Sequence, residues 1–541
     1  MRNEIVAIIG VIVIVGVSLL APKLRIAAPI ILVLIGVGIS IIPGVQPVHV
    51  PSALILTVVL PPLLYASAIN LPLIDFRRNI GSITGLSVAL VFVSAFGTGL
   101  LLFSLFPELS LASAIALGAV ISPTDAVAAT SIGKRLGLPH RLSAVIEGES
   151  LVNDASALVL LRSAVAATAG AVSLWQVAGS FVYSVVVAAV VGALVGAVTI
   201  LVRSKLSDPV LTTAVSFAVP FLAYVPAESV GASGVLSVVA AGLMTGHFGA
   251  KYFTAPSRIS ERLTWRTLQF LLENAVFLIM GLQLKDLVEQ VVDKHLSVEQ
   301  AIYFGLLATG LLIIVRFVFV MPPTLISAWR RKRHPPPTRP GAMAGDVPTG
   351  VAGGVVLSWS GMRGVVTLAA AQSLPEDTPY RPQLILIAFT VAIVTLIVQG
   401  STLPFVIKLS GIQRARAADE KVEFASLVDR LQEAGRGLLE NPELVLPGGA
   451  VPDLGVVERV KRDAKLRSQS AWEVTSLAED ETNPAPHEQY RELRLEVIRV
   501  ERETLLDERD RGEFSSHTLT RAHEMLDLEE SRLVQSEGLG G

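Results

Sequence analysis

Thirteen long apolar segments separated by short polar loops run from the start of this 541-residue chain to about residue 407. A transmembrane helix needs about 20 mostly apolar residues, because only a helix pairs every backbone polar group inside lipid. We therefore predict an all-α membrane protein with 13 transmembrane helices. Their approximate ranges are 4–20, 26–42, 51–70, 80–106, 111–133, 142–168, 173–201, 209–225, 230–247, 263–284, 299–328, 350–373 and 383–407.

The basic residues of the loops support this count and predict an orientation. Lys and Arg gather in every second loop, beginning with the loop after the first span, and are nearly absent from the loops between. The basic loops include Lys23, Arg77, Lys134, Arg203, Lys251 and Arg330. Cytoplasmic loops carry such an excess of Lys and Arg. We therefore expect a multi-pass protein of the cell membrane with its N-terminus outside and its C-terminus in the cytoplasm.

The charge distribution divides the chain into two parts. Residues 1–412 hold 26 Lys and Arg against 18 Asp and Glu, whereas residues 413–541 hold 18 against 28. We predict a transmembrane domain over 1–412 and a charged, helical cytoplasmic tail over 413–541. The tail is either a solvated appendage or a regulatory or dimer-contact element. The near-neutral total indicates no nucleic-acid partner, and the absence of cysteine excludes disulfides and thiolate metal sites.

Ionisable residues inside the predicted spans are the first candidates for function. Each costs roughly 2.5–3.5 kcal/mol on insertion scales, so such residues are rarely present without a role. The candidates are Asp125, Glu147, Glu149, Asp154, Arg162, Glu273, Arg316 and Arg363. Two of the spans that hold them also contain helix breakers, at 122–125 and 361–364. Interrupted helices at corresponding positions of inverted six-helix repeats are typical of transporter binding sites.

The sixth predicted span places two kinds of residue on neighbouring helix faces. Residues four apart share a face, so Ser150 aligns with Asp154, and Glu149 aligns with Asn153 on an adjacent stripe. A carboxylate and a hydroxyl offer hard oxygen ligands, which suit Na⁺ or Li⁺. We therefore predict that Ser150 and Asp154 bind a monovalent cation.

The fifth predicted span adds Thr124 and Asp125 next to Pro123. Proline removes a backbone donor and frees a carbonyl, so this break can offer further oxygen ligands. Two carboxylates in one dry site repel each other, and protons then compete with a cation for the same oxygens. A site that crosses the membrane holding either a cation or protons performs antiport. The alternative is that these polar groups only hold helices together.

Arg316 lies in the middle of an apolar span and needs a partner, because an unpaired buried charge costs several kcal/mol. Glu149 is the partner that leaves Asp154 free to bind an ion, although Glu147 and Glu273 compete for this role. Arg363 lies between glycines, where it more readily supports a helix break than binds an ion.

Five segments in order resemble the monovalent cation–proton antiporter family, in the Na⁺/H⁺ exchanger branch with an Asn-Asp motif. They are residues 60–65 (LPPLLY), 122–127 (SPTDAV), 148–154 (GESLVND), 281–284 (GLQL) and 361–366 (GMRGVV). The resemblance covers about residues 5–410 and implies crossed broken helices in a core domain that moves against a dimerisation domain. It differs from many members in lacking an acidic residue after the Pro-Pro segment of span three.

The resemblance also implies roles for individual residues. Asp154 would carry the cation or the proton, and Asp125, Thr124 and Ser150 would help to coordinate the cation. Asn153, Glu149, Arg316 and Arg363 would support the site's geometry. The Asn-Asp motif together with an arginine in span eleven resembles the electroneutral branch, which implies one Na⁺ per H⁺ in a homodimer that serves pH and Na⁺ homeostasis.

Other functions remain open at this point. Li⁺ or K⁺ could replace Na⁺ as the substrate, and a K⁺-selective antiporter is the main alternative. A cation channel or ion sensor would need a pore ring or a carbonyl-lined filter, for which the sequence gives no sign. The chain has no Gly-rich phosphate loop of an ATP-driven pump. We expect a transporter rather than an enzyme, with no cofactor and with membrane lipid as its surroundings.

Overall fold

The computed structural model describes residues 2–24, 26–43, 51–106, 109–169, 174–294, 296–333, 350–412, 417–441, 445–446, 450–463, 465, 486–511, 522 and 525–533. Throughout these residues the regular structure is helical, as predicted. The described residues up to 412 belong to one compact unit and those from 417 onward to a second.

The first half of the larger unit contains α1 (Arg2–Leu24), α2 (Ala28–Ile41), α3 (Ser52–Leu54), the π-helix η1 (Ile55–Val59), α4 (Leu60–Asn70), α5 (Leu73–Arg78), α6 (Ile80–Thr84), the π-helix η2 (Gly85–Ala89), α7 (Leu90–Leu105), α8 (Leu111–Ile121), α9 (Ala126–Leu136) and α10 (His140–Ala169). The second half contains α11 (Leu174–Arg203), α12 (Pro209–Ser229), α13 (Gly234–Tyr252), α14 (Ala255–Leu282), α15 (Leu284–Asp293), α16 (Val298–Arg333), α17 (Gly350–Trp359), α18 (Val365–Gln372) and α19 (Arg381–Ser410).

Each predicted span overlaps one of these helices or a consecutive run of them. Among the described residues, 7 helices are long and apolar enough to cross a membrane, and shorter apolar helices accompany them. Large aliphatic side chains on α11, including Val190, Leu194 and Val198, are more than half exposed. Lipid is the medium that tolerates such a face. The protein is thus a multi-pass membrane protein, while the number of crossings stays a prediction.

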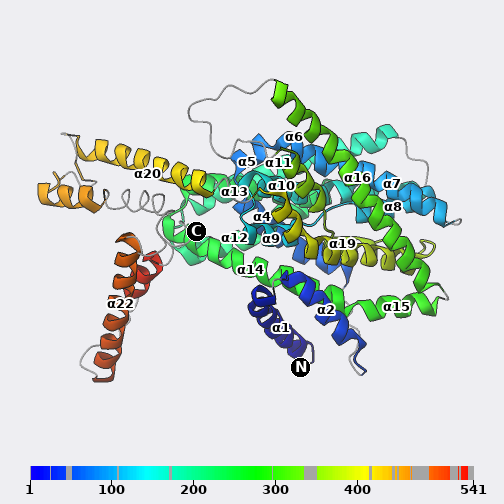
Figure 1. Ribbon diagram of the computed structural model, residues 1–541, viewed down its shortest axis with the longest axis horizontal. Coiled ribbons are helices and arrows are strands. Elements are labelled where there is room, and N and C mark those ends of the chain that lie inside the picture. The colour runs from blue at the N-terminus through cyan, green and yellow to red at the C-terminus, as the bar shows by residue number, and fades with distance from the viewer. Residues whose placement is uncertain are drawn as a thin grey trace. The chain divides into compact units, whose positions relative to one another are not determined.

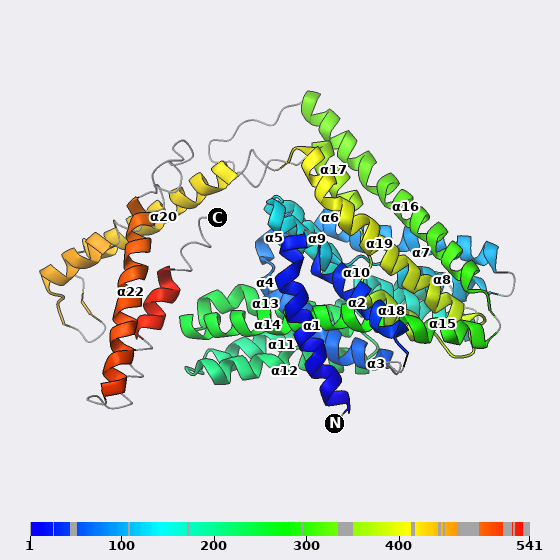
Figure 2. The ribbon, with the colours of Figure 1, turned by 60° about the horizontal axis from the view of Figure 1, so that its bottom comes forward.

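The helices of the larger unit pack in two groups (Figure 1). In the first group α11, α12, α13 and α14 pack together with α2 and α4. In the second group α7, α8, α10, α16, α17, α18 and α19 pack together, and α16 runs beside α19 (Figure 2). Helix α10 also contacts α13 and α11. This helix, which carries the GESLVND segment, therefore lies where the two groups meet.

Four interruptions shape the spans. The two predicted breaks are confirmed, because α8 and α9 are separated by residues 122–125 and α17 and α18 by residues 360–364. The two π-helical turns were not predicted. The turn η1 ends one residue before Pro61 and Pro62. These prolines cannot donate to the carbonyls four residues earlier, which lie within η1, and the widened turn relieves this local defect.

The smaller unit contains α20 (Ala417–Leu439) and α22 (Pro486–Arg511), and residues 525–533 form a further helix. Ile498 on α22 packs with Leu526 and Leu533. Arg494 donates two hydrogen bonds to Glu529, of 2.8 and 2.9 Å. These bonds hold the pKa of the Glu529 carboxyl below its usual range. The pair is therefore fully charged at neutral pH and links α22 to the last described helix.

Candidate functional site

The two broken helices cross and contact each other at their breaks. The backbone N–H of Asp125 donates to the carbonyl oxygen of Met362 at 2.7 Å. The ends of α8 and α9 therefore lie beside the break between α17 and α18, and the ends of α17 and α18 lie beside the break between α8 and α9. The ends of α9 and α18 that point to the crossing are N-termini, which carry partial positive charge, and those of α8 and α17 are C-termini, which carry partial negative charge.

Side chains from three segments compensate these helix ends. The Asp125 carboxylate accepts from the N–H of Val127 at 2.8 Å and caps α9. Ser150 Oγ on α10 accepts from the N–H of Ala126 at 3.2 Å. Arg363 Nε donates to the last carbonyl of α8, at Ile121, at 3.2 Å, and its Nη1 donates to the carbonyl of Gly361. A cation therefore faces the C-terminus of α8 and an anion faces the N-terminus of α9, as the helix dipoles favour.

Arg316 on α16 forms a buried ion pair with Glu149 on α10. Its two terminal nitrogens donate to the two carboxylate oxygens at 2.5 and 2.8 Å, and both side chains are 2% exposed. Arg316 Nε also donates to the carbonyl of Leu357 near the end of α17, at 3.1 Å. The pair thereby connects α10, α16 and the second broken helix, and it neutralises both charges.

Thr124 and Asn153 continue this network. Thr124 Oγ1 donates to Glu149 Oε1 at 2.8 Å. Asn153 Nδ2 donates to both the carbonyl oxygen and Oγ1 of Thr124, each at 3.0 Å. Asn153 Oδ1 is buried and has no partner among the described residues. The stripe of Glu149 and Asn153 thus fixes the first break and leaves one amide oxygen available.

Asp154 lies one residue along α10 from this network. It is 7% exposed, and within the described part of the chain no hydrogen bond or ion pair involves its carboxylate. A buried anion without a partner is strongly unfavourable, so this carboxylate has a strong tendency to take up a cation or a proton.

The hydroxyls that the sequence predicted as cation ligands are already engaged. Thr124 Oγ1 both donates and accepts a hydrogen bond, and Ser150 Oγ accepts one. A hydroxyl oxygen has two acceptor sites, so each of the two retains one for a cation. Their role as cation ligands stays a prediction, and their role at the break is what the hydrogen bonds establish.

Two residues of the site escaped sequence reasoning. Ser87 in η2 donates to the carbonyl of Glu149 at 3.0 Å, and Thr395 on α19 accepts from the N–H of Arg363 at 3.0 Å. A single Ser or Thr in an apolar span resembles any helix-packing residue, so neither carries a distinguishing signal.

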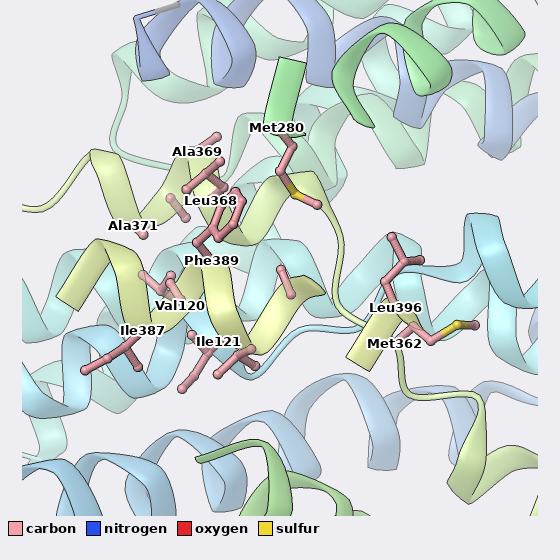
Figure 3. Close-up of a cluster of buried hydrophobic side chains, with 14 of the residues drawn as sticks. Val120, Ile121, Met280, Met362, Leu368, Ala369, Ala371, Ile387, Phe389 and Leu396 are labelled. Atoms are coloured by element: carbon pink, nitrogen blue, oxygen red, sulfur yellow. The ribbon is translucent and has the colours of Figure 1, made fainter. Parts of the chain in front are cut away.

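An apolar layer lies beside the crossing. Val120 and Ile121 from α8, Leu368 from α18 and Phe389 from α19 belong to one cluster of buried side chains (Figure 3). This layer keeps water from the flank of the crossing and strengthens the electrostatic interactions within it.

Comparison with known proteins identifies the family. The model of the family described as "Sodium/hydrogen exchanger, transmembrane" matches residues 9–409. The chain belongs to the sodium/hydrogen exchanger family. It is a transporter of the cation/proton antiporter class, as predicted, and not an enzyme.

Relatives of this exchanger extend over most of its length. An uncharacterised Na⁺/H⁺ exchanger of Mycobacterium tuberculosis is 29% identical over 98% of this chain and 96% of its own. A sodium, potassium, lithium and rubidium/H⁺ antiporter of Bacillus pumilus is 28% identical over 74% of this chain and 60% of its own. The sodium proton antiporter MjNhaP1 of Methanocaldococcus jannaschii, at 17% identity, matches the fold with a TM-score of 0.57 over 76% of this chain and all of its own. The antiporter fold predicted from the sequence is therefore confirmed.

A methyl group at Gly364 should damage the exchanger's site. A Cβ at this position would lie 2.0 Å from Asp125 Oδ2, so Gly364→Ala must displace the carboxylate that caps α9. We expect cation–proton exchange to fall at least about tenfold, which corresponds to roughly 1.4 kcal/mol. Exchange in proteoliposomes measures the effect. Gly97→Ala on α7, where a Cβ would meet nothing within 4 Å, is the matched control. Equal rates for both variants would contradict the prediction.

Proposed function

We propose that this family member exchanges Na⁺ for H⁺ by competition of the two ions for Asp154. The observation that carries the proposal is the buried carboxylate of Asp154, which has no hydrogen-bond or ion-pair partner among the described residues. Binding of a positively charged ion stabilises a carboxylate in this position most. Na⁺ and H⁺ compete for the same carboxylate oxygens, so binding of one ion requires release of the other.

The surrounding oxygens form the cation's coordination shell in this proposal. Asp125 contributes Oδ2, because Oδ1 accepts from Val127. Ser150 and Thr124 contribute their remaining acceptor sites. The unpaired Oδ1 of Asn153 is a further candidate. Carboxylate, hydroxyl and amide oxygens are hard ligands that suit Na⁺ or Li⁺.

We infer a stoichiometry of one Na⁺ for one H⁺. The charge of Glu149 is balanced by Arg316, and that of Asp125 faces the N-termini of α9 and α18. Among the acidic groups that the structure describes at the site, Asp154 is then the one without compensation. A single carboxylate that carries either a cation or a proton moves the same net charge in both directions, so the exchange is electroneutral.

Alternating access would follow from movement of the helix group that holds the crossing against the group of α2, α4 and α11–α14. The orientation with the N-terminus outside, the cytoplasmic position of residues 413–541 and a homodimeric assembly belong to the same proposal. They rest on the loop charges and on the family resemblance.

A K⁺-selective antiporter is the second candidate. The Bacillus pumilus relative is named for sodium, potassium, lithium and rubidium, and hard oxygen ligands alone do not exclude the larger ions. Exchange monitored with a pH-sensitive dye in proteoliposomes, with Li⁺, Na⁺ and K⁺ in turn, separates these substrates. Repeating the assay with an imposed membrane potential tests electroneutrality, because a rate that depends on the potential would contradict it. Cation flux uncoupled from pH would instead indicate a channel.

Competition predicts a definite pH dependence. A proton on Asp154 blocks the cation, so the cation concentration for half-maximal exchange should rise as pH falls. Where the proton-bound form of Asp154 predominates, each unit by which the pH falls should raise this half-maximal cation concentration by about tenfold, the limit for one competing proton. Exchange rates over a grid of Na⁺ concentration and pH measure this. A half-saturation value that is constant while only the maximal rate changes would exclude competition at one site.

A further inference from the structure

Gln399 on α19 is a buried amide outside the site described above. It is 0% exposed, and neither its Oε1 nor its Nε2 has a hydrogen-bond partner among the described residues. Leaving both unpaired inside a membrane protein is costly, because no lipid group replaces the lost hydrogen bonds.

Contacts on both sides place Gln399 beside the second broken helix. Thr395, four residues earlier on α19, accepts from the N–H of Arg363 at 3.0 Å. Thr402, three residues later, accepts from Trp359 Nε1 at 2.8 Å. Residues separated by three or four positions share a helix face. The segment from Trp359 to Arg363 therefore runs along this face, and Gln399 lies between its two ends.

A third contact supports this placement. A Cβ built on Gly400 would lie 3.3 Å from Met362 Sδ, and Met362 belongs to the same buried cluster as Leu396 of α19 (Figure 3). Met362 is also the residue whose carbonyl accepts from Asp125 at the crossing. Gln399 is thus close to the unwound segment that contacts the candidate ion site.

The hydrogen-bonding properties of Oε1 and Nε2 indicate which molecule binds to them. Oε1 needs a donor and Nε2 needs an acceptor, so a guest must do both. A monovalent cation would pair only with the oxygen, and the positive charge of Arg363 on the neighbouring segment disfavours it. An anion would pair only with the nitrogen. Water is neutral and both donates and accepts.

We propose that Gln399 holds a buried water molecule that connects α19 to the unwound segment between α17 and α18. Buried waters typically make about three hydrogen bonds. Two go to Gln399, and the third goes to a backbone group of the segment 360–362, where the helix ladder is interrupted. The water keeps this segment in the conformation in which Met362 accepts from Asp125. It therefore supports the crossing without binding the transported ion.

Density maps of the full-length protein in lipid nanodiscs, at a resolution that shows waters, test the site. We expect a peak within hydrogen-bond distance of both amide atoms, and no such peak in Gln399→Met, which keeps a chain of similar length. Maps recorded with Tl⁺ in place of Na⁺ separate water from a cation, because bound Tl⁺ gives a much stronger peak. Absence of the peak in the wild-type protein, or its strengthening by Tl⁺, would overturn the proposal. The wild-type maps decide even if the variant does not fold.

Measurements of the exchange rate test the role of the water. This test rests on the proposed exchange function. We expect Gln399→Met to lower the maximal rate by about fivefold, the effect of losing one hydrogen bond of ordinary strength. The half-saturation value for Na⁺ should not change, because no ligand of the cation is removed. Thr390→Val, whose hydroxyl donates to Leu386 within α19, is the control. An unchanged rate in Gln399→Met would overturn the supporting role. Lack of exchange in the wild type would contradict the proposed function and leave the density test intact.

Discussion

Replacing Asp154 with asparagine should abolish cation–proton exchange while the protein stays folded. The amide has nearly the same shape as the carboxylate but carries no charge, and it can neither release a proton nor balance a cation. We expect the exchange rate to fall at least about 100-fold, equivalent to roughly 2.7 kcal/mol of lost stabilisation. Proteoliposomes with an internal pH dye and an imposed Na⁺ gradient provide the measurement.

The control for this substitution is Asp208→Asn. Asp208 accepts from the N–H groups of Val210 and Leu211 at the start of α12, and asparagine is an equally good residue at that position. Its variant should therefore exchange at the wild-type rate. If Asp154→Asn keeps substantial exchange at normal protein levels, a different group must carry the ion, and Asp125 would be the next to substitute.

Breaking the ion pair of Arg316 and Glu149 should have the largest effect on stability. Arg316→Met leaves Glu149 buried and unpaired, which typically costs about 3–5 kcal/mol. We expect a clear fall in the thermal unfolding midpoint of the purified protein, together with loss of exchange. The double variant Glu149→Gln with Arg316→Met removes both charges and should recover most of the stability.

Helix α10, which carries Glu149, also forms an exposed ion pair that can be compared with the buried one. Arg162 forms an ion pair with Glu228 at 2.6 Å, but the Arg162 side chain is 50% exposed, against 2% for Arg316. Exposed pairs contribute at most about 1 kcal/mol. Arg162→Met should therefore change the midpoint little. Equal effects of Arg162→Met and Arg316→Met would show that burial of the Glu149 pair does not determine its contribution.

Residues with strong local chemistry allowed the fold and much of the site's layout to be predicted. Apolar length gave the helices, and the proline and glycine of segments 122–125 and 361–364 predicted the two breaks. Arg316 needs an acidic partner because it lies in an apolar span, and this requirement alone makes Glu149 a candidate. These features were predictable because each imposes a large energetic constraint that depends little on distant parts of the chain.

The features that could not be predicted depend on contacts between distant segments. The hydrogen bonds of Thr124 are one example, because its hydroxyl position depends on Asn153 and Glu149, which reach it from another helix. The π-helical turns depend on details of packing that apolar periodicity does not encode. Gln399 looks in the sequence like any polar residue near the end of a span. Its significance follows from the absence of a partner for its amide within the described structure.

The ion pair between α10 and α16 has a consequence for how the protein is made. Its two residues are 167 positions apart, and a chain enters the membrane from its N-terminus, so Glu149 is inserted before Arg316 has been synthesised. The first broken helix likewise precedes the second, whose Met362 accepts from Asp125. The nascent N-terminal half therefore holds an acidic group without its counter-ion and an incomplete crossing. Only when the last spans arrive can the site close, so a truncated product would retain membrane helices but have no assembled ion site.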